Sequence, residues 1–85
     1  MDKGILFFNA PWCEPCKILK PVMDQIAREG INVKSINTEY DAEFTELYSP
    51  RSIPTLIMTD MGGNEIKRTV AGGWTKEQVL NWFNS

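Results

Sequence analysis

The sequence predicts an α/β fold: a four-stranded mixed sheet with helices on both faces, formed by a single domain over residues 1–85. Short apolar runs and helical patterns follow one another in the order strand, helix, strand, helix, strand, strand, helix. A chain of 85 residues is long enough for one hydrophobic core but not for two. Hydrophobic residues make up an ordinary 42% of the chain, and no linker, repeat or low-complexity tract divides it.

The first half of the chain reads as a strand–helix–strand unit. Residues 4–9 form a short continuous apolar run, which is typical of a strand covered on both faces. From Cys16 onward, apolar residues recur at helical spacing until Gly30, which predicts a long helix and its end. Residues 31–37 predict a second strand. Two strands joined through a helix in this way are expected to be parallel, with a right-handed crossover.

The second half of the chain predicts a short helix, a hairpin and a last helix. Residues 41–48 carry apolar side chains on one side and form the short helix. Strands over residues 55–59 and 65–70 are separated by a segment with two glycines, which indicates a β-hairpin. Thr75, followed three residues later by Gln78, is a capping box that predicts the start of the last helix.

The charge and hydropathy of the chain argue against several classes of partner. The net charge is -2, and Lys and Arg form no cluster, so neither nucleic acid nor an anionic membrane surface is expected as a partner. No stretch approaches the roughly 20 apolar residues of a membrane span. The apolar run of residues 5–8 is too short for a signal peptide and lacks its cleavage site. We therefore expect a cytoplasmic protein, in which a close cysteine pair is reduced and serves catalysis or metal binding.

The only two cysteines, Cys13 and Cys16, lie between the first strand and the long helix. This is the carboxyl end of a parallel strand, where open α/β sheets place their sites. A tetrahedral zinc site needs four N, S or O ligands, whereas the chain has two thiols and no histidine. Zinc would need carboxylates or a second subunit to complete its ligands, so we expect no metal.

Redox chemistry fits the cysteine pair better than metal binding. Unpaired N–H groups and the positive end of the helix dipole stabilise a thiolate at this position. We expect Cys13 to be that thiolate, on the solvent side of the first turn, with Cys16 beneath it and within disulfide reach. Cys13 would attack the disulfide of a partner, and Cys16 would then attack the Cys13 sulfur and release the reduced partner.

The residues around the pair are expected to tune this chemistry. Pro15 stiffens the turn and has no amide hydrogen. Glu14 places a negative charge near the thiolate and so raises the pKa of Cys13, an effect that Lys17 opposes. The alternative is that Cys13 and Cys16 are an inert pair or a passive staple, but Trp12 and the flanking prolines on a solvent-facing loop do not suit that role.

The segment W-C-E-P-C-K resembles the thioredoxin active site W-C-G-P-C-K, with Glu14 in place of the glycine. Pro21 matches the proline inside the active-site helix, S-I-P-T-L from Ser52 resembles the cis-proline segment, and Gly72 matches the glycine of the substrate groove. These motifs cover most of the chain in the right order. The resemblance implies a minimal thioredoxin fold, βαβαββα.

The resemblance also implies how substrates bind. It implies a cis Ile53–Pro54 bond lying against the cysteines, and a substrate-binding surface formed by Trp12, Ile53, Pro54 and Gly72. The backbone of Ile53 would then pair with an extended segment of the target. Without the resemblance, Pro54 reads as an ordinary trans proline at the start of a strand.

Three features depart from the family pattern. The first strand and helix of full-length thioredoxin are missing. The buried aspartate beneath the thioredoxin cysteines falls at Phe7, and its lysine partner falls at about Ser35. With no carboxylate inside, we expect Cys16 to lose its proton through water or Glu14, and release of the mixed disulfide to be slow near neutral pH.

The function implied is that of a protein dithiol–disulfide oxidoreductase that reduces protein disulfides. It would act as a monomer, need no cofactor besides its own redox-active disulfide, and receive electrons from a thioredoxin reductase or from glutathione. A glutaredoxin-type, glutathione-dependent enzyme is the first alternative, since A-G-G-W at residues 71–74 resembles the Gly-Gly contact to glutathione. Against it, glutaredoxins usually read C-P-Y-C, with a basic residue shortly before it.

A second alternative is a binding subunit that makes no use of its thiols. Its interaction surface would be the apolar rim formed by Trp12, Ile53, Gly72 and Trp74. Trp74 itself has two possible places, either in this groove or at the start of the last helix.

Overall fold

The computed structural model describes residues 3–85, so the first two residues of the predicted domain lie outside the described part. All of the predicted elements are present in the predicted order, with boundaries within one or two residues of those expected. The elements are β1 (Lys3–Asn9), α1 (Glu14–Arg28), β2 (Asn32–Asn37), α2 (Ala42–Tyr48), β3 (Thr55–Asp60), β4 (Glu65–Val70) and α3 (Lys76–Asn84).

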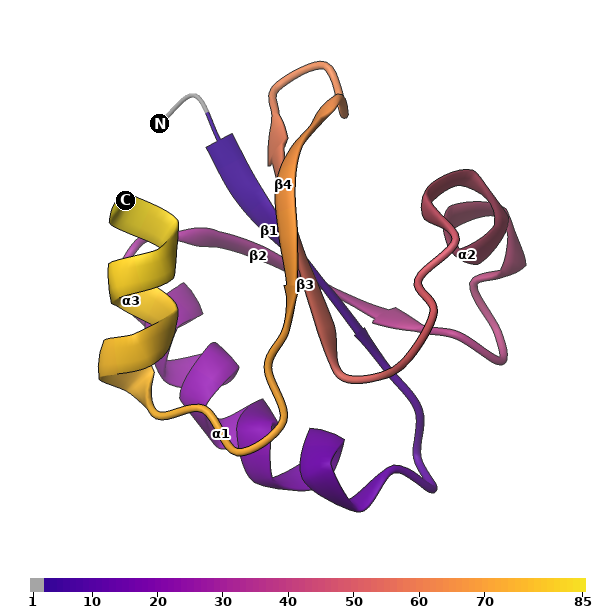
Figure 1. Cartoon of the computed structure of the whole chain (residues 1–85), viewed down its shortest axis with the longest axis horizontal. Helices are drawn as coiled ribbons and strands as arrows, with labels where there is room; N and C mark the ends of the chain where they lie inside the picture. Colours follow the sequence, from indigo (N-terminus) through magenta and orange to yellow (C-terminus); the bar gives the residue numbers. More distant parts are fainter. Residues whose placement is uncertain (1–2) are drawn as a thin grey trace.

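The strands form one mixed sheet in the order β2-β1-β3-β4. β1 and β2 are parallel, as predicted for two strands joined through a helix. β3 runs antiparallel to both β1 and β4, and β3 and β4 form the expected hairpin. Strand β1 is therefore central, and its carboxyl end leads directly into the cysteine segment (Figure 1).

Helices cover both faces of the sheet, as predicted. Along β1, Ile5 and Phe7 point to one face, while Leu6 and Phe8 point to the other, and all four are buried. Helices α1 and α3 pack on the first face, and α2 packs on the second (Figure 1). Burial on both faces explains why β1 reads as a continuous apolar run.

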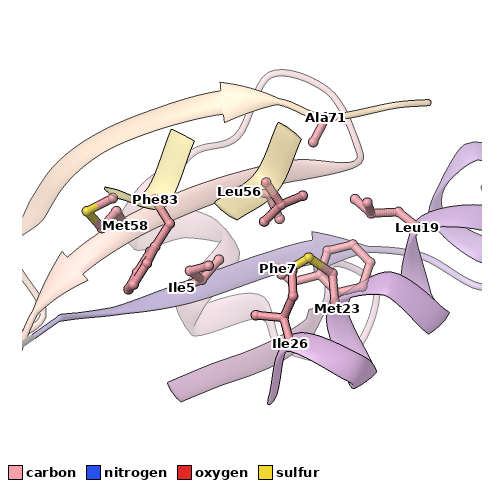
Figure 2. Packing of buried hydrophobic residues seen from close by; sticks show 10 residues of the cluster. Ile5, Phe7, Leu19, Met23, Ile26, Leu56, Met58, Ala71 and Phe83 are labelled. Atoms are coloured by element: carbon pink, nitrogen blue, oxygen red, sulfur yellow. The ribbon is translucent and has the colours of Figure 1, made fainter. Parts of the chain in front are cut away.

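We call the cluster between the sheet and helices α1 and α3 the main core (Figure 2). It consists of Ile5, Phe7, Leu19, Met23, Ile26, Leu56, Met58, Ala71, Val79 and Phe83. In α1, the buried residues are Cys16, Leu19, Met23 and Ile26. Because they recur at steps of three and four, Cys16 lies on the same helix face as the main-core residues. The core thus fixes the rotation of α1 and the position of Cys16.

A capping box of two hydrogen bonds fixes the start of helix α3. The hydroxyl of Thr75 accepts a hydrogen bond from the backbone N–H of Gln78 at 3.2 Å, and the Gln78 side chain accepts one from the Thr75 N–H at 2.9 Å. The predicted capping box is therefore confirmed at the start of α3. Pro21 lies inside α1, as expected.

Candidate active site

Cys13 is the N-cap residue of α1, with extended backbone angles of φ -89° and ψ 105°. Its carbonyl accepts the N–H of Lys17 at 3.1 Å, and its Sγ accepts the N–H of Cys16 at 3.3 Å. The sulfur therefore occupies the position at which an N-cap side chain meets the free N–H groups of the first turn. These donors and the positive end of the helix dipole favour a negative charge on this sulfur.

The structure joins Cys13 and Cys16 by a disulfide, with 5.2 Å between their Cα atoms. That separation lies within the usual range for disulfides, so the pair can open and close without moving the backbone far. Both residues are buried: Cys13 is 5% exposed and Cys16 is 3% exposed. The expectation that Cys13 lies on the solvent side is therefore not met in the disulfide form, in which Cys13 is bonded to Cys16 and is almost as buried.

The loop before β3 lies against the disulfide. The Ile53–Pro54 peptide bond is cis, as the resemblance implied. The side chain of Ile53 packs with Ala10 and the two cysteines. Neither the N–H nor the C=O of Ile53 forms a hydrogen bond to any residue from 3 to 85. These backbone groups remain available for an extended peptide.

Gly72 lies where three segments of the chain converge. A Cβ atom at this position would lie 3.6 Å from Cβ of Pro15 and 3.8 Å from Cδ of Pro54. The neighbouring Ala71 donates its N–H to the carbonyl of Pro54 at 3.1 Å, which ties the end of β4 to the cis-proline segment. The structure therefore brings together the active-site turn, the cis-proline loop and the glycine, as predicted.

The two tryptophans near the predicted groove have different environments. Trp12 is 65% exposed, and its Nε1 donates a hydrogen bond to Oε1 of Glu39, in the loop between β2 and α2. Trp74 is partly buried and packs against the main core. Of the two places considered for Trp74, the structure favours the position just before the cap of α3, where it packs as a core residue.

Glu14 and Lys17 form an ion pair at the start of α1. Their charged atoms lie 3.0 Å apart, and the side chains are 77% and 56% exposed. Lys17 was expected to oppose the effect of the Glu14 charge, and the two side chains contact each other directly on the surface. Exposed pairs of this kind contribute little to stability, about 0 to 1 kcal/mol. The pair also keeps the Glu14 carboxylate directed towards solvent, beside Lys17.

Within the part of the chain that the structure describes, no ionisable side chain is buried beneath the cysteines. Phe7, where the resemblance places a buried aspartate in thioredoxins, is 1% exposed within the main core. Ser35 pairs with Phe7 across the β1–β2 ladder, is exposed, and accepts a hydrogen bond from Nδ2 of Asn9 at 2.9 Å. Among residues 3–85, the only buried polar side chains are those of Thr55 and Thr59. The interior below the disulfide is therefore apolar, as the sequence suggested.

In the described part of the chain, no three His, Cys, Asp or Glu side chains gather in a way that could hold a metal ion. None of the helices there has the length and apolar character needed to cross a membrane.

Comparisons with known proteins agree with this geometry. The thioredoxin family model matches residues 2–85. A thioredoxin from Rickettsia typhi is 36% identical over 83 residues, which cover 94% of this chain and 77% of the relative. A thioredoxin from Pyropia yezoensis is 40% identical over 80 residues, covering 91% of this chain and 73% of the relative.

A similar solved structure is that of a mutant thioredoxin from Halobacterium salinarum NRC-1. It superimposes with a TM-score of 0.79 at 28% identity, covering 96% of this chain and 71% of the other. The family match spans nearly the whole sequence, and the structure places a bonded Cys-x-x-Cys pair at the start of a helix. The chain therefore belongs to the thioredoxin family and is a protein dithiol–disulfide oxidoreductase.

Proposed function

We propose that Cys13 is the attacking thiolate and Cys16 the resolving thiol in the reduction of protein disulfides. The observation that carries this assignment is the position of the Cys13 sulfur at the N-cap of α1, where it accepts the Cys16 N–H at 3.3 Å. Cys16, by contrast, continues the buried face of α1 and has the main core beneath it.

The reaction proceeds in two exchanges. The Cys13 thiolate attacks one sulfur of the target disulfide, so a Cys13–target disulfide forms and the other target sulfur leaves as a thiolate. Cys16, once deprotonated, attacks the Cys13 sulfur, which forms the Cys13–Cys16 disulfide and releases the second target thiolate. Two electrons pass to the target, and the released thiolates take protons from solvent. No cofactor besides the cysteine pair takes part.

The target binds across the surface formed by Trp12, Ile53, Pro54 and Gly72. An extended target segment pairs with the free N–H and C=O of Ile53, which gives affinity without dependence on sequence. The exposed ring of Trp12 provides apolar contact on one side. Gly72, with no side chain, leaves room beside Pro15 and Pro54 for the target backbone.

Proton transfer from Cys16 depends on solvent. The interior beneath the disulfide has no ionisable group among residues 3–85, and the Glu14 carboxylate is already paired with Lys17 on the surface. Of the two routes expected from the sequence, water is therefore favoured over Glu14. A proton that must leave through water makes release of the mixed disulfide slow near neutral pH.

The electron donor is a thioredoxin reductase rather than glutathione, and the protein works as a single-domain monomer in the cytoplasm. Support for the reductase comes from the thioredoxin match, and from Asn9, Ala10 and Pro11, which offer no basic side chain before Cys13 to bind a carboxylate of glutathione.

The test is the reduction of insulin by dithiothreitol, measured as turbidity with wild type and with Cys13→Ser. We expect the wild type to accelerate the reaction and the variant to give the rate of dithiothreitol alone. Equal rates for the two proteins would contradict the assignment and leave only the binding role. The same assay with NADPH and thioredoxin reductase, against glutathione with its reductase, identifies the donor; faster reduction by glutathione would favour the glutaredoxin-type alternative.

A further inference from the structure

A surface pocket lies on the segment between α2 and β3, which contains the cis Ile53–Pro54 bond, and on the end of β4. It has a volume of about 340 Å³ and is lined by Arg51, Ser52, Thr55, Arg68, Thr69 and Val70. We call it the arginine pocket. Ser52 and Thr55 flank the Ile53–Pro54 bond in the sequence, so the arginine pocket adjoins the surface on which a target segment is proposed to pair.

One of the two arginines, Arg68, already has hydrogen-bond partners within the protein. Its Nε and Nη2 donate hydrogen bonds to both carboxylate oxygens of Glu65, at 2.7 and 2.6 Å, and Nη2 also donates to the carbonyl of Tyr48 at 2.7 Å. Glu65 neutralises this guanidinium and raises the pKa of Arg68. The role of Arg68 is therefore to join β4 to the end of α2.

Arg51 differs from Arg68 in its lack of a partner within the described residues. It is exposed and makes no hydrogen bond or salt bridge to any residue between 3 and 85. The remaining lining side chains are neutral, so Arg51 provides the uncompensated positive charge of the arginine pocket. Beside it, Val70 is 57% exposed and offers an apolar wall. A guanidinium with free donors next to an apolar wall suits a carboxylate on a short aliphatic stem.

We propose that the arginine pocket is a specificity subsite that binds an Asp or Glu side chain of the target protein. The proposal rests on the proposed function, because pairing with Ile53 is what brings a target segment to this place. Arg51 precedes Ile53 by two residues, a backbone distance of at most about 7 Å. The acidic residue therefore lies within about three residues of the target residue that pairs with Ile53. Since the protein as a whole carries a charge of -2, the attraction is local.

The test uses synthetic peptide disulfides that carry self-quenched fluorophores and differ in one residue. Each has Glu or Gln at two or three residues before or after the cysteine, and the second-order rate constant of reduction is measured by stopped flow with the reduced protein. We expect the wild type to reduce the better Glu peptide roughly threefold faster than its Gln counterpart at low salt, the effect of one exposed ion pair. The preference should disappear near 1 M salt, where such pairs are screened.

Variants test whether the preference for the Glu peptide depends on Arg51. Arg51→Gln should bring the Glu-to-Gln rate ratio to one, and Arg51→Glu should reverse it in favour of a peptide with Lys at the same position. The matched control is Arg28→Gln, which removes the same charge from the last turn of α1, on the other face of the sheet. We expect this control to keep the wild-type ratio.

Two results would overturn the subsite alone. A wild-type ratio of one at every position would do so while leaving the proposed function intact, because both peptides would still be reduced. Loss of the preference in Arg28→Gln as well would assign it to overall charge instead of the arginine pocket. If the wild type reduced neither peptide, the proposed function itself would fall, and the subsite with it.

Discussion

The two sides of the Cys13–Cys16 disulfide differ in almost every physical property. On the inner side, Cys16 continues the row of Leu19 and Met23 into the main core, where Phe7 is fully packed. On the outer side lie exposed polar pairs: the Trp12 indole with Glu39, and Glu14 with Lys17. The inner side is buried and apolar, while these exposed pairs place charge on the outer side.

This difference separates the tasks of the two sides. Close packing below the disulfide sets the rotation of α1, and so directs the N–H of Cys16 at the Cys13 sulfur. Among residues 3–85, the inner side supplies no group that can accept a proton. We therefore assign target recognition, control of charge and transfer of protons to the outer side and to solvent, as part of the proposed function.

The largest effect should come from removing packing on the inner side. Phe7→Ala deletes a buried ring from the main core, and we expect the free energy of unfolding to fall by about 3 to 5 kcal/mol. Trp12→Ala, the control on the outer side, should cost less than about 1 kcal/mol, because that side chain is 65% exposed. Urea denaturation measures both. Equal losses for the two variants would contradict the contrast between the sides.

A second, intermediate effect tests the lack of an inner proton acceptor. If Cys16 loses its proton only to water, the rate at which the mixed disulfide is released should rise roughly tenfold per pH unit between pH 6 and 7.5, because only the thiolate attacks. The fluorescence of Trp12, next to Cys13, provides a stopped-flow signal. Glu14→Gln should keep this slope. A rate that is already independent of pH at pH 7 would indicate an acceptor that the inner side lacks in the structure.

The smallest effect concerns an ion pair on the outer surface. Arg68 lowers the pKa of Glu65 below its ordinary value of about 4.5. The stabilisation is therefore complete above that ordinary value and is lost as the pH falls through the lower pKa of the folded state. Both side chains are about one-third exposed, so solvent screens the pair. Glu65→Gln should cost about 0.5 kcal/mol at pH 7.

The measurement compares the free energy of unfolding of Glu65→Gln with that of the wild type across pH. Thermal or urea unfolding should show the 0.5 kcal/mol gap shrinking below about pH 4, as Glu65 becomes protonated in the wild type too. A gap that stays constant down to pH 2 would mean that the loss comes from packing of the side chain and not from its charge.

Most of the fold could be predicted from the sequence because its signals are local. The apolar run of β1, the Gly30 stop and the Thr75–Gln78 capping box each act over a few residues, and the structure places each element accordingly. The cysteine pair was equally clear, because Cys-x-x-Cys at the start of a helix is a local pattern. The cis bond at Pro54 was not, since a proline at the start of a strand reads as trans from the residues alone; the family resemblance pointed to the cis bond.

What the sequence did not indicate depends on contacts between distant segments. The contact of Trp12 with Glu39 joins residues far apart in the chain. One signal for it was present: Glu39 follows β2, which is parallel to β1, so both strands end at the same edge of the sheet. Arg51 and Arg68 look alike in the sequence, and only the structure shows that Arg68 donates to the carbonyl of Tyr48, at the end of α2, as well as to Glu65.

The central claim is that the N-terminus of α1 activates Cys13, while Cys16 is held on the inner side. The most direct measurement is alkylation of the freshly reduced protein with limiting iodoacetamide at pH 7, followed by peptide mass spectrometry. We expect the label to enter Cys13 well before Cys16. Labelling of both at equal rates, or of Cys16 first, would contradict it.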